Sequence, residues 1–472
     1  MSLEKLSFKN ATGQLLSGSI VGRALNFCLN LMLSRTLGPT GLGLFSLVLS
    51  TSQSFEIAAR AGVDYGLSCE LTEQKQPPSK SERSVIAATA LQVVGITSLV
   101  LAAVLWVWVV AFNGLLPVGL RISRQGAALA LVVIAVLESL GSLPWELLLI
   151  AGQTKLVALR QGLFAPLKLL LALLGAQMLG FPGALIGYGL VAAAQCAWLQ
   201  QECKRFYTWP SGQSPRWGKG WKLVQSGLGL YGTNALAAIV FLPLLAYLAQ
   251  DSGVAEVGYF RVGQILVQLF TLLPGAIAPV LFLKLRTSND EESKKRNSEI
   301  SLHLVWWIGL TALLLYLFID HQVVAVFFGN SFLPAIQPTR LLVLMAVLDS
   351  VNQLLHTPLL ASKKTRLFAI TQNCAAFLAG VIGYLLIPKW GLQGFLAAKV
   401  VFSLLPVMVY LKESWHRLNP SRMLMLSLAT LLLSPLCWII DLGAQLSSVL
   451  MIVVAVILAV EGKRLLPLLA TY

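Results

Sequence analysis

Charged residues recur inside the most apolar part of this sequence, and their spacing predicts a polar strip on a helix. The stretch FEIAARAGVDYGL, residues 55–67, carries Glu56, Arg60 and Asp64 at every fourth position. Residues four apart share one helix face and can interact. Two interpretations follow from this spacing. Arg60 bridges the two carboxylates in a self-paired strip, or the strip lines a polar passage and leaves Arg60 partly available to an anionic ligand.

Arg23 stands in the middle of the apolar segment SIVGRALNFCLNL, which contains no acidic residue. Asn26 and Asn30 follow three and seven positions later and continue a polar stripe. A charge at the centre of a bilayer costs at least about 2.5–3.5 kcal/mol, so such residues face protein or water. Arg23 therefore either pairs with an acid on another helix or, as we favour, faces a water-filled lumen.

Basic residues outnumber acidic residues inside the apolar segments, which suggests a cavity that accepts an anion. The basic residues are Arg23, Arg60, Arg160, Lys168, Arg261, Arg340 and Lys399, and the acidic residues are Glu56, Asp64, Glu138, Glu146 and Asp349. We predict that Arg23, Arg60, Lys168 and Lys399 bind substrate, with Arg160 next. Arg160 lies near a segment end, where a long side chain can reach the interface. The five acids are predicted to pair with these cations or to couple transport to an ion.

The elements that must position these charges are membrane-spanning helices. Of the 472 residues, 57% are hydrophobic and 12% are charged, about half the charged fraction of a soluble domain. Segments long enough to span a bilayer need about 20 mostly apolar residues. Fourteen candidates lie at 12–35, 41–67, 84–112, 126–151, 155–179, 182–203, 223–249, 255–284, 300–319, 334–361, 365–387, 391–411, 422–440 and 446–463. The net charge of +15 is spread over short loops, which favours a membrane protein over one that binds nucleic acid.

Lysine and arginine mark one side of the predicted membrane. If the spans alternate, one side holds both termini and all but four of the loop lysines and arginines. The four exceptions are Arg35, Arg121, Arg124 and Lys389. Because positive loops stay in the cytoplasm, both termini are predicted to be cytoplasmic.

Short matches at a nearly constant offset predict an internal duplication. GPTGLGLF at 38–45 resembles GVAEVGYF at 253–260, at an offset of 215 (253 − 38). TKLVALRQ at 154–161 resembles TRLFAITQ at 365–372, at an offset of 211 (365 − 154). Two copies with an even number of helices each give parallel repeats around a central cavity.

The predicted fold is therefore all-α, with two parallel six-helix bundles and two further helices. Its parts are an N-terminal bundle at 1–205, a cytoplasmic linker at 206–222, a C-terminal bundle at 223–415 and two additional helices at 416–472.

Several enzyme motifs fail on their context. GLGLYG, residues 227–232, matches a dinucleotide-binding pattern but opens an apolar helix and follows no strand. GQSPRWGKG, residues 212–220, lacks the spacing and the hydroxyl residue of a phosphate-binding loop. The six cysteines contain no C-x-x-C pair, and we predict neither a zinc site nor a disulfide framework. No cofactor, metal site or enzymatic activity is predicted.

The opening of the chain resembles bacterial polysaccharide flippases, the O-antigen or Wzx-like members of the multidrug/oligosaccharidyl-lipid/polysaccharide exporter superfamily. The resemblance lies in LSRTLGPTGLGLFSLVLS at 33–50 and AGVDYGL at 61–67, with their Arg-x-Leu-Gly turn, Gly-x-Phe and G-x-D-x-G-L. Arg23 also resembles the central arginine in the first helix of lipid II flippases, although Ala24 follows it here in place of an acid.

The resemblance implies a flippase that carries undecaprenyl-pyrophosphate-linked oligosaccharide across the bacterial cytoplasmic membrane by alternating access. It implies a cavity lined by cations, membrane lipids as surroundings, and polysaccharide assembly enzymes as partners. An ion-coupled multidrug exporter of the same superfamily is the alternative, although it would favour an acidic cavity. A membrane-embedded glycosyltransferase would need catalytic carboxylates in a sizeable loop, which the sequence lacks. A scaffold without transport activity would have no use for seven buried bases.

Overall fold

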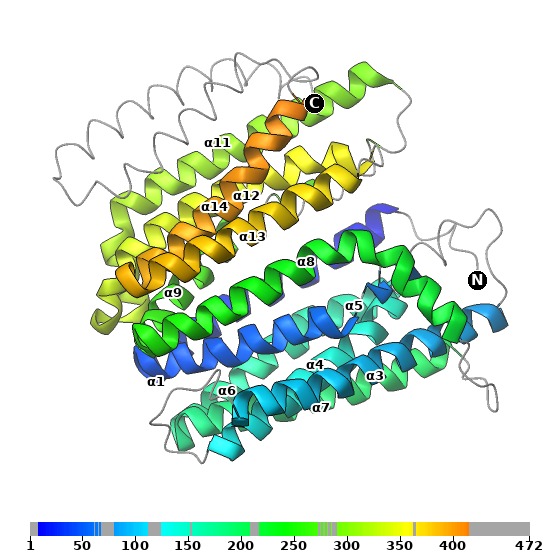
Figure 1. Cartoon of the computed structure of the whole chain (residues 1–472), viewed down its shortest axis with the longest axis horizontal. Helices are drawn as coiled ribbons and strands as arrows, with labels where there is room; N and C mark the ends of the chain where they lie inside the picture. Colours follow the sequence, from blue (N-terminus) through cyan, green and yellow to red (C-terminus); the bar gives the residue numbers. More distant parts are fainter. Residues whose placement is uncertain are drawn as a thin grey trace. The chain divides into compact units, whose positions relative to one another are not determined.

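A computed structural model of the chain describes most of its first 414 residues (Figure 1). The described residues are 8–60, 62–64, 66–67, 80–111, 124–151, 153–207, 217–271, 274, 277–278, 281, 285, 290–361 and 365–414. All regular structure in these ranges is helical. Nine of the described helices are long and apolar enough to cross a membrane. The predicted spans 422–440 and 446–463 lie outside the described residues.

The chain forms two compact units, Met1–Gly258 and Tyr259–Tyr472. Helices of the first unit are α1 (Phe8–Arg60), α3 (Lys80–Ala111), α4 (Arg124–Ile150), α5 (Thr154–Leu159), α6 (Ala165–Leu179), α7 (Phe181–Phe206) and α8 (Trp217–Asp251). A π-helix, η2 (Arg160–Phe164), joins α5 to α6. Helix α9 (Val254–Phe270) crosses the boundary between the units. Helices of the second unit are α11 (Glu291–Val323), η3 (Val324–Phe328), η4 (Asn330–Ala335), α12 (Ile336–Ala361), α13 (Thr365–Trp390) and α14 (Leu392–Ser414).

Within the first unit, α1 packs against α3, α4, α6 and α8, while α7 packs against α4 and α6. Within the second unit, α12 packs against α11 and α14, and α13 packs against α14 (Figure 1). Each unit therefore brings helices from distant parts of its sequence together. Charged side chains on different helices of the same unit can therefore contact one another.

The predicted turn between the first two spans is a sharp break at Gly38. There φ is 66° and ψ is −178°, and the chain continues directly into the next helical arm as part of α1. A positive φ suits glycine because it has no Cβ. Pro39 follows, and proline is tolerated in the first turn of a helix because it needs no amide donor there. Gly253 repeats the break with a φ of 103°.

Helix boundaries repeat along the chain at one offset. Helices α3, α5 and α7 begin at Lys80, Thr154 and Phe181, and α11, α13 and α14 begin 211 residues later, at Glu291, Thr365 and Leu392 (291 − 80, 365 − 154 and 392 − 181). Packing repeats as well. A Cβ on Gly183 would lie 2.0 Å from the Gly175 carbonyl oxygen, and one on Gly394 would lie 2.4 Å from the Leu386 oxygen. Both contacts need glycine, because the helix backbones approach closely.

Two loops predicted as polar are shorter than expected. Helix α11 begins at Glu291, nine residues before the predicted start at residue 300 (300 − 291). Asp290 caps it, because its carboxylate accepts the amide hydrogens of Glu292 and Ser293 at 3.1 Å each. Helix α8 begins at Trp217, inside the predicted linker. Hydropathy placed the starts of α8 and α11 too late, because the polar first turns of a helix can extend beyond the apolar segment that spans the membrane.

Helix α8 packs against α1 and α3, so it belongs to the first compact unit. The duplication in the sequence would place this helix at the start of the second copy. Compact units and sequence repeats need not share a boundary, and the predicted domain limits at 205 and 223 remain a prediction.

Candidate functional site

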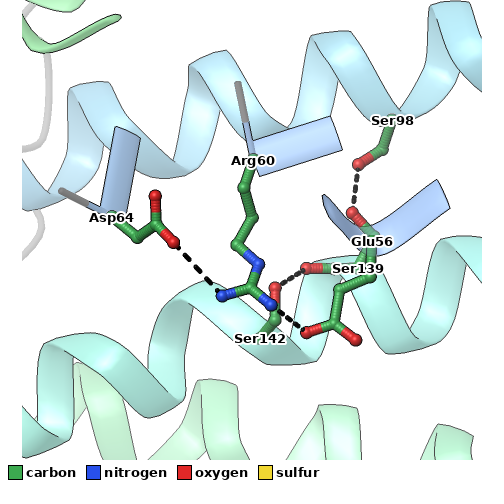
Figure 2. Close-up of polar contacts among 6 residues, drawn as sticks. All are labelled: Glu56, Arg60, Asp64, Ser98, Ser139 and Ser142. Atoms are coloured by element: carbon green, nitrogen blue, oxygen red, sulfur yellow. Dashed lines mark hydrogen bonds and ion pairs between the residues drawn. The ribbon is translucent and has the colours of Figure 1, made fainter. Parts of the chain in front are cut away.

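The strip of charges near the end of α1 is internally paired (Figure 2). The Arg60 guanidinium donates to Glu56 Oε1 at 2.7 Å and contacts Asp64 Oδ2 at 3.3 Å. The Arg60 and Glu56 side chains are each 19% exposed, and that of Asp64 is 17% exposed. The arrangement therefore has the bridging geometry of the first interpretation, while some surface of all three residues stays accessible.

Hydroxyl groups on α3 and α4 lie beside this strip (Figure 2). Ser98 and Ser139 share a hydrogen bond of 2.8 Å between their hydroxyls, and the Ser142 hydroxyl donates to the Ser139 carbonyl at 2.8 Å. Thr97 on α3 donates to the Ala59 carbonyl on α1. These hydrogen bonds link α3 to α1 and to α4 beside the charged residues. The strip therefore lies next to a group of hydroxyl side chains that the hydropathy of the sequence does not indicate.

Glu138, Lys168 and Tyr188 form a second cluster, contributed by α4, α6 and α7. Lys168 Nζ donates to Glu138 Oε1 at 2.5 Å, and the Tyr188 hydroxyl donates to the same oxygen at 3.0 Å. The Lys168 ammonium also lies 5.4 Å from the centre of the Tyr188 ring. Glu138 is 9% exposed and Lys168 is 6% exposed. This pair is sealed inside the first unit.

Arg160 lies at the start of the π-helix η2, where the helix is locally widened. Its guanidinium carbon is 4.8 Å from the centre of the Trp145 ring, which is a cation–π contact. Glu146 is half-buried on α4, next to Trp145, and interacts electrostatically with both Arg60 and Arg160. Arg160 is therefore held by an aromatic face and a nearby carboxylate, and π-helical turns are frequent at functional sites.

Arg23 differs from the other basic residues of the first unit because its side chain is exposed. It lies midway between Phe8 and the break at Gly38 in the first arm of α1. Among the residues that the structure describes, no carboxylate forms an ion pair with it. An exposed guanidinium at this depth is far more stable facing water than facing lipid. Asn30, seven residues on, is 3% exposed and donates to the Asn26 carbonyl at 2.7 Å.

Asp349 and Lys399 are the predicted site residues of the second unit. Asp349 lies on α12 and interacts electrostatically with Lys399 on α14. Lys399 Nζ also lies 6.0 Å from the centre of the Phe402 ring. Asp349 is exposed and Lys399 is half-buried. Asp349 and Lys399 are therefore more accessible than Glu138 and Lys168.

The predicted site residues thus fall into groups rather than into one cluster. Glu56, Arg60 and Asp64 lie together, Glu138 pairs with Lys168, and Asp349 interacts with Lys399. Arg340, one of the seven basic residues of the apolar segments, forms an ion pair with Asp320 of α11. Among the described residues, no three histidine, cysteine or acidic side chains converge as metal ligands would.

Sequence reasoning missed Tyr188 and Trp145, because aromatic residues are ordinary in membrane helices. One signal in the sequence shows that two of the predicted acids are equivalent. VLES at 136–139 matches VLDS at 347–350 at the offset of 211 (347 − 136), so Glu138 and Asp349 occupy equivalent positions of the two copies. Tyr188 and Lys399 are equivalent by the same offset (399 − 188).

No protein-family model matches the sequence, and no curated protein sequence matches it. Solved structures do match. The inward closed conformation of the lipid II flippase MurJ is 13% identical, with a TM-score of 0.72 over 96% of this chain and 99% of that chain.

Transporters of another kind match over less of the chain. An inward-facing multidrug resistance MATE transporter of the MOP superfamily is 15% identical, with a TM-score of 0.62 over 86% of this chain and 98% of that chain. A MOP-superfamily transporter from Pyrococcus furiosus, reported to have a binding pocket of reversed polarity, is 14% identical. Its TM-score is 0.59 over 87% of this chain and 95% of that chain.

These matches define the class of fold. Over the residues that the structure describes, the chain is an all-helical, multi-pass membrane protein with the fold of MOP-superfamily transporters. The matched proteins are transporters, and at these identities the likeness concerns the fold alone. The function has to be argued from the charges.

Proposed function

We propose that this protein is a flippase for an undecaprenyl-pyrophosphate-linked oligosaccharide of the Wzx-like kind. It would bind the lipid-linked sugar at the inner leaflet of the bacterial cytoplasmic membrane and release it outside by alternating access. Both termini would lie in the cytoplasm, and polysaccharide assembly enzymes would supply and consume the substrate.

The observation that carries this proposal is the exposed Arg23 in the middle of its helix. A guanidinium that faces water inside the membrane is a site for an anion, and it can bind phosphate oxygens in a bidentate way. The fold likeness supports the choice of anion, because the matched MurJ is a lipid II flippase and the match covers 96% of this chain.

Direction of transport follows from the charge of such a substrate. Moving one elementary charge across a membrane is worth about 2.3 kcal/mol per 100 mV, so an inside-negative potential favours export of a pyrophosphate. The half-buried acids Glu56 and Asp64 are candidates for an additional step in which an ion moves the other way. Arg60 would then exchange its carboxylate partners during the cycle.

An ion-coupled multidrug exporter is the second candidate, and one observation favours it. The charged clusters of the first unit contain four acids, Glu56, Asp64, Glu138 and Glu146, but only three bases, Arg60, Arg160 and Lys168. A surplus carboxylate suits a cationic drug or a proton. Arg23 and Lys399 lie outside these clusters and suit an anion, which is why we place the flippase first.

The proposal is tested by following lipid-linked oligosaccharide in a strain that lacks this gene and any redundant flippase. An impermeant reagent added to intact spheroplasts distinguishes outer-leaflet from inner-leaflet sugar. We expect the oligosaccharide to accumulate on the inner leaflet and wild type to restore export. Arg23→Ala should restore little export, Arg23→Lys should restore part of it, and Lys389→Ala, on an exposed lysine of α13, should restore it fully.

Different outcomes separate the two candidates. Inner-leaflet accumulation without rescue by Arg23→Ala, at normal membrane levels of the variant, supports the flippase and its cationic site. Full rescue by Arg23→Ala removes Arg23 from the substrate site. No accumulation in the deletion strain rejects the flippase, and a matching rise in sensitivity to cationic drugs would support the exporter.

A further inference from the structure

Three polar residues follow one face of the first arm of α1, and they become more buried along the helix. Asn26 lies three residues after Arg23 and Asn30 four residues after Asn26, spacings that keep side chains on one helix face. Arg23 is exposed, Asn26 is half-buried and Asn30 is 3% exposed. The proposed function uses Arg23 and leaves the two asparagines without a role.

The hydrogen bond of the Asn30 side chain fixes which of its atoms is left over. Asn30 Nδ2 donates to the Asn26 carbonyl oxygen at 2.7 Å. A backbone carbonyl oxygen only accepts, so the atom that faces it must be the NH₂ group, and the amide cannot be turned round without losing this bond. The remaining atom, Oδ1, is an acceptor that cannot donate.

Two amide oxygens on this face are buried without a partner. Neither Asn26 Oδ1 nor Asn30 Oδ1 accepts a hydrogen bond within the part of the chain that the structure describes. Buried polar atoms are nearly always hydrogen-bonded, so these oxygens call for a donor that the protein does not supply. The partner of Asn30 Oδ1 must carry an O–H or N–H group, which excludes an ionised phosphate.

The position of the two amides relative to Arg23 suits a sugar that is joined to a phosphate. A helix rises about 1.5 Å per residue, so Asn26 lies about 4.5 Å from Arg23 along the axis. The Asn30 amide reaches back toward Asn26, because it bonds to the carbonyl group of that residue. If Arg23 binds a phosphate, the sugar attached to this phosphate lies within reach of both amides, and its hydroxyls are O–H donors.

We infer that Asn30, together with Asn26, forms a sugar-binding subsite beside the phosphate site of Arg23. This inference rests on the proposed flippase function and names the part of the substrate that the subsite binds, which is the first sugar. Arg23 responds to negative charge, whereas Asn30 Oδ1 responds only to a hydrogen-bond donor. Binding of the sugar removes the cost of an unsatisfied buried acceptor, so the subsite favours a carrier that holds sugar over one that does not.

The test compares two lipids that have the same charge and differ only in the sugar. One is undecaprenyl-pyrophosphate-linked N-acetylglucosamine, and in the other a methyl group replaces the sugar. Binding of each lipid is measured on the purified full-length protein in nanodiscs, and we expect wild type to prefer the sugar lipid.

Substitution of Asn30 should remove this preference without weakening the phosphate site. Asn30→Leu keeps a similar size but lacks the acceptor. It should bind the sugar lipid about tenfold more weakly, which is about 1.4 kcal/mol and the size expected for one hydrogen bond, and bind the methyl lipid as wild type does. Arg23→Ala should weaken binding of both lipids. Asn297→Leu, at a half-buried asparagine near the start of α11, is the matched control and should alter neither affinity.

Thermal unfolding separates a sugar contact from a structural role. Asn30→Leu removes an unsatisfied buried acceptor, so its thermal stability without lipid should equal or exceed that of wild type, and a clear loss would make Asn30 structural and overturn the subsite. If wild type binds neither lipid, the proposed flippase function fails. If wild type binds both lipids equally, or if Asn30→Leu keeps the wild-type preference, the flippase stands, Asn30 Oδ1 holds only water and the sugar subsite is overturned.

Discussion

Glu138 and Asp349 hold the same position in two copies of one helical repeat, yet Glu138 is buried and Asp349 is exposed. The enclosed acid has a lysine and a tyrosine as partners, from two further helices. The exposed acid interacts with a lysine that stands where the first copy has the tyrosine. The same sequence position thus holds a buried acid in one copy and an exposed acid in the other.

The physical reason for the difference is the cost of enclosing charge. A buried pair is tolerated only when geometry and additional hydrogen bonds compensate for lost hydration. Glu138 and Lys168 meet this condition with the help of Tyr188. Asp349 is exposed and Lys399 is half-buried, so solvent screens their attraction more strongly.

A second contrast lies about two turns further along the same helices. Trp145 on α4 stacks on Arg160 in the first unit, and its equivalent is His356 on α12 (356 − 145 = 211). His356 packs instead against the rings of Phe368 and Tyr410, at 4.9 Å and 6.2 Å between centroids. The first copy also contains the π-helix η2, whereas α13 is α-helical throughout. The π-helical turn and the arginine that begins it therefore occur in the first copy and not at the equivalent place in α13.

The largest effect should come from breaking the enclosed pair. Lys168→Ala leaves the Glu138 carboxylate buried without its cation, and we expect a loss of about 3–5 kcal/mol in the free energy of unfolding. Lys399→Ala should cost clearly less, because Asp349 keeps its contact with water. Thermal unfolding of the two purified variants, followed by size-exclusion chromatography, measures the difference. Equal losses would mean that the two pairs are equally structural.

The repeat itself suggests how to repair the first variant. Adding Tyr188→Lys to Lys168→Ala places a lysine where the second copy has Lys399, and we expect most of the lost thermal stability to return. Tyr188→Met in the same background is the control, since it supplies similar length without charge. No recovery by the lysine would show that the equivalence in sequence does not extend to side-chain reach.

Arg60 and Arg23 should differ in what their loss affects. Arg60→Ala leaves Glu56 and Asp64 without the cation that they share, and we expect about 1.5–3 kcal/mol of destabilisation. Arg23→Ala removes an exposed residue and should leave thermal stability unchanged while lowering transport of lipid-linked sugar. Measuring unfolding and transport on both variants separates the two roles. A stability loss in Arg23→Ala would indicate an unrecognised structural partner.

The smallest effect is expected at the aromatic contact of Arg160. Trp145→His installs the residue of the second copy and removes the indole face, which should cost about 0.5–1 kcal/mol. Trp145→Phe keeps an aromatic ring and should cost less. Thermal unfolding of the two variants tests this order, and the reverse order would assign the contribution of Trp145 to packing rather than to the cation.

The sequence alone predicted the helices and their duplication because both depend on local properties. Apolar length marks a span, and glycine marks positions where the backbone must break or approach another helix. Gly38 and Gly253 show the first case, and Gly183 shows the second. The pairing of Glu56 with Arg60 was also readable, because residues four apart on one helix are placed side by side by the helix geometry itself. The contact of Arg60 with Asp64 was not fixed in this way, because α1 ends at Arg60 and Gly62 has a φ of 78°.

Tertiary structure alone decided the partners of the remaining charges. Lys168 meets Glu138, 30 residues earlier, only because α4, α6 and α7 pack together, and its other neighbour, Tyr188, carries no charge to reveal it. Exposure followed the same packing, which enclosed Lys168 and left Arg23 and Asp349 in contact with solvent. A charged residue in an apolar segment has the same sequence pattern whether it is buried or exposed, because its neighbours come from other helices.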